Sequence, residues 1–400
     1  MDFAKLDVVD WFSGRVRRCT MKRMAWLLLM LVLPSSAEAW CQKGTVLEGM
    51  NERFPGNSGP DIVVRVDLNQ SVQGAVDVAT DVNGDGYIII GAVNGGSGEP
   101  YGHVSQRVVV DGTYPLPFGL FGCSLTLHDP NPSDNLPTAR ITLAASGPDI
   151  FVMDLHGAGS GVAGWLVEGD GRQLSNTHAA SNALGYMFLG NGNVLHNSTA
   201  DYNIQVGIFI QGDGNVVDTT KSKSNGSHGI QVVGDGNLLS KNTVGEKGRG
   251  NAGVGILVAG TGNVVSENRV MANGSHGIEV SGGTAVSPNV IKKSIVGDRS
   301  MGNLGNGILI REDSGNGMSS PVELDQNTVR ANGLNGIAID SGVDHSLKSN
   351  ISGGTAGYDN GDCEFLVASG NVNAGGNKAN GLTVPGRTGD PFPTGCVGTP

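Results

Sequence analysis

The sequence predicts an all-β protein: a single-stranded, right-handed parallel β-helix with three short strands per coil of about 22 residues and a short N-terminal cap helix. Three observations predict this solenoid. A Gly-Ile-x-Val motif recurs through the second half of the chain, and turns bearing asparagine recur beside it. The chain also holds 65 glycines against six tyrosines and four tryptophans, a composition typical of many turns around a thin core.

Residues 1–39 are predicted to be a signal peptide. Basic residues after Met21 precede a run of nine apolar residues over 25–33, and small residues at 37 and 39 suit a cleavage site. The apolar run is too short to cross a bilayer of ~30 Å, and Met21 is an alternative start. We therefore expect a secreted, periplasmic or cell-surface protein that has no membrane insertion after signal cleavage.

The net charge limits the classes of partner that we expect, and the cysteine content indicates disulfides. The net charge of −11 opposes binding to phosphate backbones and anionic lipids, so neither nucleic acid nor membrane is expected as a partner. Four cysteines follow the signal peptide, an even number that favours two disulfides with three connectivities open, and their spacing fits no zinc motif. They are Cys41, Cys123, Cys363 and Cys396. We pair Cys363 with Cys396, which would staple the C-terminal tail.

The first elements follow a lead-in over 40–69. Apolar residues at 72, 75, 76 and 79 have helical spacing, which predicts the cap helix over 71–79. Asp81, Asn83 and Asp85 come next and match the first three ligands of a calcium loop, followed by a turn glycine. Position 12 of that loop is Ala92, not the bidentate glutamate. Calcium at this site is one interpretation, and a tight Asp-Gly turn is the other.

The coils are clearest from residue 185. Alternation within each Gly-Ile-x-Val strand points its first and third apolar residues inward. The first inward column is Tyr186, Ile208, Ile230, Ile256, Ile278, Ile308 and Ile337. The second is Phe188, Ile210, Val232, Val258, Val280, Ile310 and Ile339. We expect the β-helix to span 70–358 and an irregular tail to follow over 359–400.

Asparagines mark the turns between these strands. Asn215, Asn237 and Asn263 follow glycines one coil apart and are predicted to form a hydrogen-bonded ladder. Asparagine at a turn also suits left-handed backbone conformations.

The cap helix, the asparagine-bearing turns and the Gly-Ile-x-Val strands together resemble the pectin-lyase-like superfamily, in particular its exported parallel β-helix repeat proteins. The resemblance covers roughly 70–358. It implies the fold strongly and the activity weakly, because the superfamily includes lyases, polygalacturonases, epimerases, tailspikes and adhesins. The polygalacturonase and epimerase motifs that the resemblance would imply are absent: Gly-His-Gly and Arg-Ile-Lys do not occur, and His128 precedes Asp129-Pro130 instead of following such a pair.

The outward side of the Gly-Ile-x-Val strands is the candidate site. It is largely apolar, and among its charged residues Arg311, Glu279 and Asp340 could serve a polysaccharide lyase. The alternative is a surface ion pair worth ~0–1 kcal/mol. We expect the C-terminal tail to cover the apolar part of this side; a partner is the other option.

Two histidines recur in identical Asn-Gly-Ser-His-Gly-Ile segments. Val254 occupies the coil between His228 and His276, so the two lie ~10 Å apart, too far to share a zinc ion. We interpret them as polar turn residues.

These features predict an exported β-helix protein that presents an extended surface to a polysaccharide or another cell-envelope component. The alternative is a polysaccharide lyase, or a related enzyme, that acts on an acidic polysaccharide.

Overall fold

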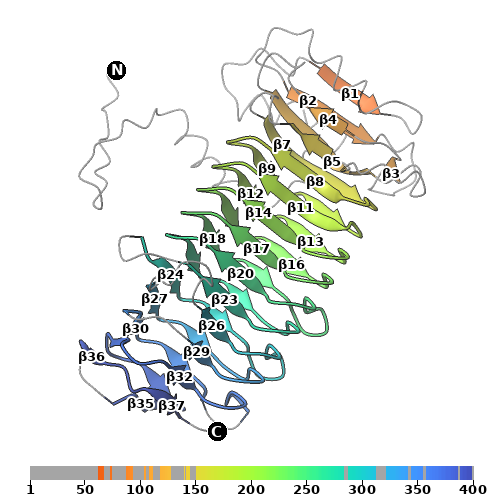
Figure 1. Ribbon diagram of the computed structural model, residues 1–400. Helices are drawn as coiled ribbons and strands as arrows, with labels where there is room; N and C mark the ends of the chain where they lie inside the picture. Colours follow the sequence, from red (N-terminus) through yellow and green to blue (C-terminus); the bar gives the residue numbers. More distant parts are fainter. Residues whose placement is uncertain are drawn as a thin grey trace, which may run out of the picture. The chain divides into compact units, whose positions relative to one another are not determined.

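The computed structural model is a stack of β-coils (Figure 1). It describes residues 62–66, 73, 87–92, 103–104, 108–110, 118–127, 139, 141–144, 150–282, 287–311, 321–340, 344–354, 357–385 and 388–398. Side chains are described at 73, 108–110, 139, 141–144 and from 157 onward. Within these residues, no helix is long and apolar enough to cross a membrane.

Three faces form the stack, and between residues 163 and 379 each coil contributes one strand to each face. The first face is a twelve-stranded sheet, parallel except for its last strand. Its strands, in spatial order, are β4 (Val108–Val110), β6 (Ile141–Leu143), β8 (Ala163–Glu168), β11 (Leu184–Leu189), β14 (Ile208–Gln211), β17 (Ile230–Val233), β20 (Ile256–Ala259), β23 (Ile278–Ser281), β26 (Ile308–Arg311), β29 (Ile337–Ile339), β32 (Phe365–Val367) and β37 (Gly395–Val397).

The other two faces belong to one continuous 25-stranded sheet. The second face holds β9 (Gln173–Ser175), β12 (Val194–His196), β15 (Val216–Asp218), β18 (Leu238–Ser240), β21 (Val264–Ser266), β24 (Asn289–Lys292), β27 (Val322–Asp325), β30 (Ser346–Lys348), β33 (Val372–Asn373) and β36 (Asp390–Pro391). The third face holds β10 (His178–Ala180), β13 (Thr199–Asp201), β16 (Lys221–Lys223), β19 (Thr243–Val244), β22 (Arg269–Val270), β25 (Ile295–Val296), β28 (Thr328–Val329), β31 (Ile351–Ser352), β34 (Lys378–Ala379) and β35 (Leu382–Thr383).

Five strands begin the 25-stranded sheet, and four of them are at least five residues long. The five are β1 (Ile62–Val66), β2 (Tyr87–Ala92), β3 (His103–Val104), β5 (Phe118–Leu127) and β7 (Ile150–Ala158). The strand β7 pairs with both β9 and β10, so the second and third faces separate after it.

The core contains the pair of columns that the alternation predicts, together with inward side chains of the other two faces, such as Leu195 and Val244. Ile208 pairs with Ile230, Ile230 with Ile256, and the register continues through Ile337 to Phe365. Side chains in both columns are at most 1% exposed. Burying a residue of this kind contributes ~1.5–3 kcal/mol relative to leaving it exposed, so the columns are a main source of stability. The predicted parallel β-helix is confirmed, whereas the cap helix that belonged to the same prediction stays a prediction.

Asparagine ladders connect the coils. The predicted ladder is confirmed, because Asn215 Nδ2 donates to Asn237 Oδ1 (3.1 Å) and Asn237 Nδ2 donates to Asn263 Oδ1 (3.0 Å). A longer ladder lies at the turn between the third and first faces. It links Asn182, Asn203, Asn225, Asn251, Asn273, Asn303, Asn332 and Asn360.

The ladder asparagines do not adopt the left-handed conformation that the sequence suggests. At most ladder positions the preceding residue adopts it instead, as Gly214 (φ 62°), Gly236 (φ 64°) and Ser224 (φ 55°) show. The turn at that residue lets the next side chain point between the coils, where its amide forms hydrogen bonds with the coils on both sides. Asparagine is selected here for its hydrogen bonds.

The C-terminal segment is more regular than predicted. Residues 365–379 supply a further coil, and β35, β36 and β37 then pair antiparallel with β34, β33 and β32. Phe392 packs against Phe365 with ring centroids 5.3 Å apart, and the predicted Cys363–Cys396 disulfide is present. The described part of the tail therefore closes the end of the stack, which hides its open edge. It does not cover the first face as we expected, because its strands extend the stack.

Several predicted features fall outside the described residues. They are the signal peptide over 1–39, Cys41 and the calcium candidates Asp81, Asn83 and Asp85; for Cys123 only the backbone is described. Of the predicted cap helix only Gln73 is described. Its side-chain amide donates to Val109 O (3.0 Å) and accepts from Val109 N (2.8 Å), so this residue contacts the first strand of the twelve-stranded sheet.

Candidate functional site

The candidate site is the outward side of the twelve-stranded sheet, called here the outer face. Strand register aligns its side chains in two rows along the stack. The first row is Leu166, Met187, Phe209, Gln231, Leu257, Glu279, Leu309, Ala338 and Leu366. The second row is Glu168, Leu189, Gln211, Val233, Ala259, Ser281 and Arg311, with Asp340 directly after β29.

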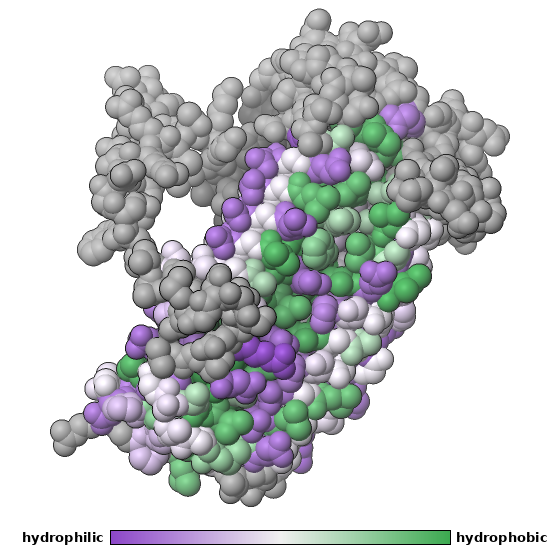
Figure 2. Space-filling view, in the orientation of Figure 1, coloured by the Kyte–Doolittle hydropathy of each residue, from purple (hydrophilic) through white to green (hydrophobic). Residues whose placement is uncertain are grey.

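The composition of the outer face changes along its length. Leu166, Met187, Phe209 and Leu257 are half-buried, and Val233 is 41% exposed. Figure 2 shows a band of hydrophobic side chains over the middle of the stack, followed by hydrophilic ones toward its C-terminal end. An apolar strip thus leads into a polar region.

The polar region contains the three predicted site residues, which the fold brings together. Arg311 Nη1 lies 3.2 Å from Glu279 Oε1, and Arg311 Nε lies 4.0 Å from Asp340 Oδ2. Arg311 and Asp340 are half-exposed, whereas the Glu279 side chain is 14% exposed. We call these three residues the charged cluster. Its arginine is neutralised by two carboxylates from the coils on either side.

Two imidazoles lie near this cluster. His276 lies two residues before β23, and His228 occupies the same position before β17. Burial lowers the pKa of both histidines, and the charge of Glu279 opposes this shift in each. Both rings are therefore neutral at neutral pH and can donate or accept hydrogen bonds without adding charge.

No metal site is apparent here. In the described parts of the chain, no group of three or more His, Cys, Asp or Glu side chains is arranged to hold an ion. Asp213 and Asp235, which stack one coil apart, instead accept backbone N–H groups: Asp213 Oδ1 from Asp235 N (2.8 Å), and Asp235 Oδ1 from Thr261 N (2.7 Å).

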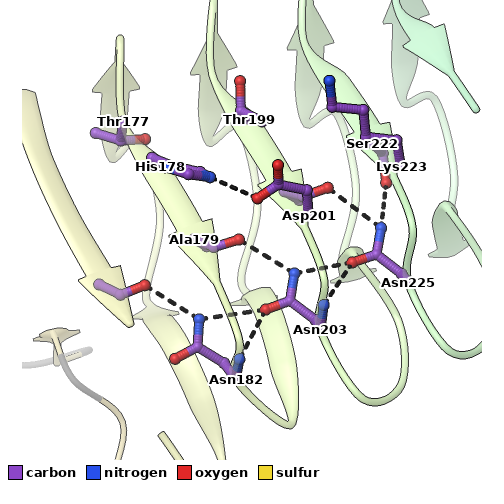
Figure 3. A network of polar contacts seen from close by, with 12 residues as sticks. Thr177, His178, Ala179, Asn182, Thr199, Asp201, Asn203, Ser222, Lys223 and Asn225 are labelled. Atoms are coloured by element: carbon purple, nitrogen blue, oxygen red, sulfur yellow. Dashed lines mark hydrogen bonds and ion pairs between the residues drawn. The ribbon is translucent and has the colours of Figure 1, made fainter. Parts of the chain in front are cut away.

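The other faces carry polar pairs that the sequence analysis missed. On the third face, His178 Nε2 lies 2.6 Å from Asp201 Oδ1, beside the long asparagine ladder (Figure 3). On the second face, Asp218 binds His196 Nδ1 (3.1 Å) and accepts from Ser240 Oγ (2.6 Å). These pairs join residues one coil apart, so their spacing of 22 or 23 residues is the signal that could have revealed them.

Comparisons with known proteins support the fold. Residues 184–356 match the family model described as a right handed beta helix region. No curated protein sequence matches the chain. The fold is thus a right-handed parallel β-helix.

The chain is also similar to solved structures of several different proteins, including the three that follow. The Dettilon tailspike protein is 15% identical, with a TM-score of 0.54 over 80% of this chain and 67% of its own. The catalytic domain of a GH87 α-1,3-glucanase, solved with nigerose, is 13% identical, with a TM-score of 0.51 over 80% of this chain and 70% of its own. The A-module of the Azotobacter vinelandii mannuronan C-5 epimerase AlgE4 is 17% identical, with a TM-score of 0.46 over 70% of this chain and 89% of its own.

Proposed function

We propose that the protein binds a polysaccharide lengthwise along the outer face. The observation that carries this proposal is the row from Phe209 to Glu279, in which apolar and hydrogen-bonding side chains alternate from coil to coil after the apolar residues Leu166 and Met187. Sugar rings have apolar C–H faces and polar hydroxyl edges. Half-buried Phe209 and Leu257 suit the former, and Gln231 between them suits the latter.

The charge of the face favours a neutral polysaccharide. Arg311 contributes one positive charge to the two rows, whereas Glu168, Glu279 and Asp340 contribute three negative ones. A polymer with a carboxylate on each sugar would be repelled over most of this length. The GH87 α-1,3-glucanase with a similar fold was solved in complex with nigerose, a neutral sugar, which supports a glycan as the ligand.

We further propose that the protein is exported. The Cys363–Cys396 disulfide is of the kind that forms in oxidising compartments, and the predicted signal peptide agrees with it. An exported protein of this shape would meet polysaccharide in the cell envelope or outside the cell.

The test is titration calorimetry of the full chain against soluble neutral glucans and xylan, with pectate and alginate as acidic counterparts. The proposal predicts binding to at least one neutral polymer and weaker binding to both acidic ones. Absence of binding to every polymer would overturn it.

A second candidate function is cleavage by the charged cluster. The observation in its favour is that Arg311, Glu279 and Asp340 meet beside neutral His276, which could move a proton. Against a lyase, the guanidinium already contacts two carboxylates and is less available to a uronate group. Ultraviolet absorbance of unsaturated products from pectate or alginate, abolished in Arg311→Ala, would establish the lyase.

A further inference from the structure

His228 and His276 each accept a backbone hydrogen bond from the next coil, an arrangement called here the histidine mount. His228 Nδ1 accepts the backbone N–H of Val254 (3.1 Å), and His276 Nδ1 accepts that of Asn306 (3.0 Å). In each case the donor is the equivalent residue of the next coil. Each ring therefore leans over the coil that follows it.

A glycine makes room for each ring. A Cβ at Gly253 would lie 2.9 Å from His228 Nδ1, and one at Gly305 would lie 2.7 Å from His276 Nδ1, both closer than a methyl group tolerates. Backbone hydrogen bonds align Ser275 and Leu334 with these two glycines. Ser275 and Leu334 therefore occupy the equivalent position on coils that do not follow a histidine. Glycine thus occurs on the coil after each histidine and is replaced on the alternate coils. Glycine is present where a ring needs the space and absent where none does. We infer that the ring position fixed by the histidine mount is important.

The mount leaves one ring nitrogen available. Because Nδ1 is an acceptor, the neutral ring carries its proton on Nε2. Neither Nε2 has a hydrogen-bond partner among the residues that the structure describes, and both rings are half-buried at the edge of the outer face. Each histidine therefore offers one fixed N–H donor to a ligand.

The two donors have a defined spacing. They lie on alternate coils and so are about 9.6 Å apart along the stack, two strand spacings. This is close to the length of one disaccharide in an extended polysaccharide. A chain lying along the outer face, in which every second sugar has the same orientation, would present the same oxygen to both donors.

We propose that His228 and His276 form a two-point grip for a neutral polysaccharide with a two-sugar repeat, in which each Nε2–H donates to a hydroxyl or ring oxygen. This inference rests on the proposed function and adds the ligand's repeat and orientation to it. The polymer runs parallel to the stack axis.

The chain supplies a conservative substitution for the test. Farther along the same column, Asn306 Oδ1 accepts Asn335 N (3.0 Å) and Asn335 Oδ1 accepts Cys363 N (3.1 Å). An asparagine thus makes the inter-coil hydrogen bond that the histidines make through Nδ1. His228→Asn and His276→Asn should keep this bond and the fold, and they remove the outward Nε2–H.

The experiment compares the full-length wild type, both single variants and the double variant in titrations with cellobiose and cellohexaose. We expect cellohexaose to bind the wild type at least tenfold more tightly than cellobiose, since only the longer chain reaches both donors. Each single variant should bind cellohexaose about fivefold more weakly, the loss of one hydrogen bond. Thermal unfolding of each variant verifies its fold, and Gly305→Ala, which displaces the His276 ring and leaves the residue in place, should weaken binding as His276→Asn does.

Several outcomes would overturn the grip, and they differ in what they say of the proposed function. Equal cellohexaose affinity in the wild type and the double variant would remove the grip and leave polysaccharide binding standing. Binding of a different glycan but not of cellohexaose would do the same. Absence of binding to every polysaccharide would remove both proposals.

Discussion

Arg311 and Glu279 approach within 3.2 Å (Nη1 to Oε1) across adjacent coils of the outer face. Strand register explains the contact, because Arg311 pairs with Ser281 and its long side chain reaches back to the residue two positions earlier. Asp340 meets the same guanidinium from the following coil. The guanidinium is thus compensated and one carboxylate charge is left over, which disfavours an acidic ligand at the cluster.

Removing one ladder asparagine should destabilise the protein. Asn251 is 1% exposed, accepts from Asn225 Nδ2 (2.8 Å) and donates to Ser222 O (3.0 Å) and Asn273 Oδ1 (2.9 Å). Asn251→Ala leaves buried groups of both neighbouring coils without partners, at ~1–3 kcal/mol each. Chemical denaturation should show a loss of at least ~2 kcal/mol, whereas Lys247→Ala, an exposed control, should show almost none. Equal stability of the two variants would contradict the role of the ladder.

Glycine in the repeat motif should be required for space. A Cβ at Gly229 would lie 2.4 Å from Val244 Cγ1 and 2.7 Å from Gly255 O, whereas at Gly161 it would meet nothing within 4 Å. Gly229→Ala should therefore lower the unfolding midpoint markedly because the core must shift, and Gly161→Ala should leave it unchanged or slightly raised. Thermal unfolding followed by circular dichroism compares them. A tolerated Gly229→Ala would show that the coils are not packed this closely.

Opening the C-terminal disulfide should loosen the end of the stack. Cys363 and Cys396 are 33 residues apart in the sequence, and a cross-link of that span stabilises by about 3–4 kcal/mol in the chain-entropy estimate. Cys363→Ser/Cys396→Ser should lower the unfolding midpoint and make the segment after residue 380 susceptible to proteolysis. An unchanged midpoint and digestion pattern would mean that antiparallel pairing alone holds the cap.

Asp218 should contribute to acid stability. Burial alone would raise the pKa of its carboxyl, but hydrogen bonds from His196, Ser240 and Thr219 outweigh burial and lower the pKa to about 2. A carboxyl whose pKa is lower in the folded state stabilises the fold above its unfolded pKa, near 3.8, and this contribution disappears as the pH falls toward 2. Because the group is partly solvated, we expect about 1 kcal/mol.

The corresponding measurement is unfolding free energy against pH for the wild type and Asp218→Asn. The wild type should lose stability relative to the variant between about pH 4 and pH 2. Parallel curves over this interval would contradict the assignment.

Much of the architecture could be predicted from the sequence because a solenoid repeats its chemistry. The Gly-Ile-x-Val copies determine which side chains face inward, and the observed register from Ile208 to Ile337 follows them. The charged cluster could be found for the same reason, since residues at equal positions in the motif become neighbours in space.

Other features could not be predicted in this way. The long asparagine ladder lies in turns of varying length, so its members, such as Asn273 and Asn303, are unevenly spaced. The antiparallel cap after Asn380 has no repeat to reveal it, and its pairing depends on Phe392 packing against Phe365. The histidine mounts could not be predicted, because the sequence does not show which residues of the next coil lie beneath the rings.

The central claim is that the outer face binds polysaccharide, and a pair of substitutions on one coil tests it most directly. Phe209 in β14 and Val216 in β15 are both half-buried and point outward, Phe209 on the outer face and Val216 on the second face. In titrations with the polysaccharide that the wild type binds most tightly, Phe209→Ala should weaken binding about tenfold, the effect of ~1.4 kcal/mol, and Val216→Ala should leave it unchanged. Equal affinities in the two variants, or a loss confined to Val216→Ala, would contradict the claim.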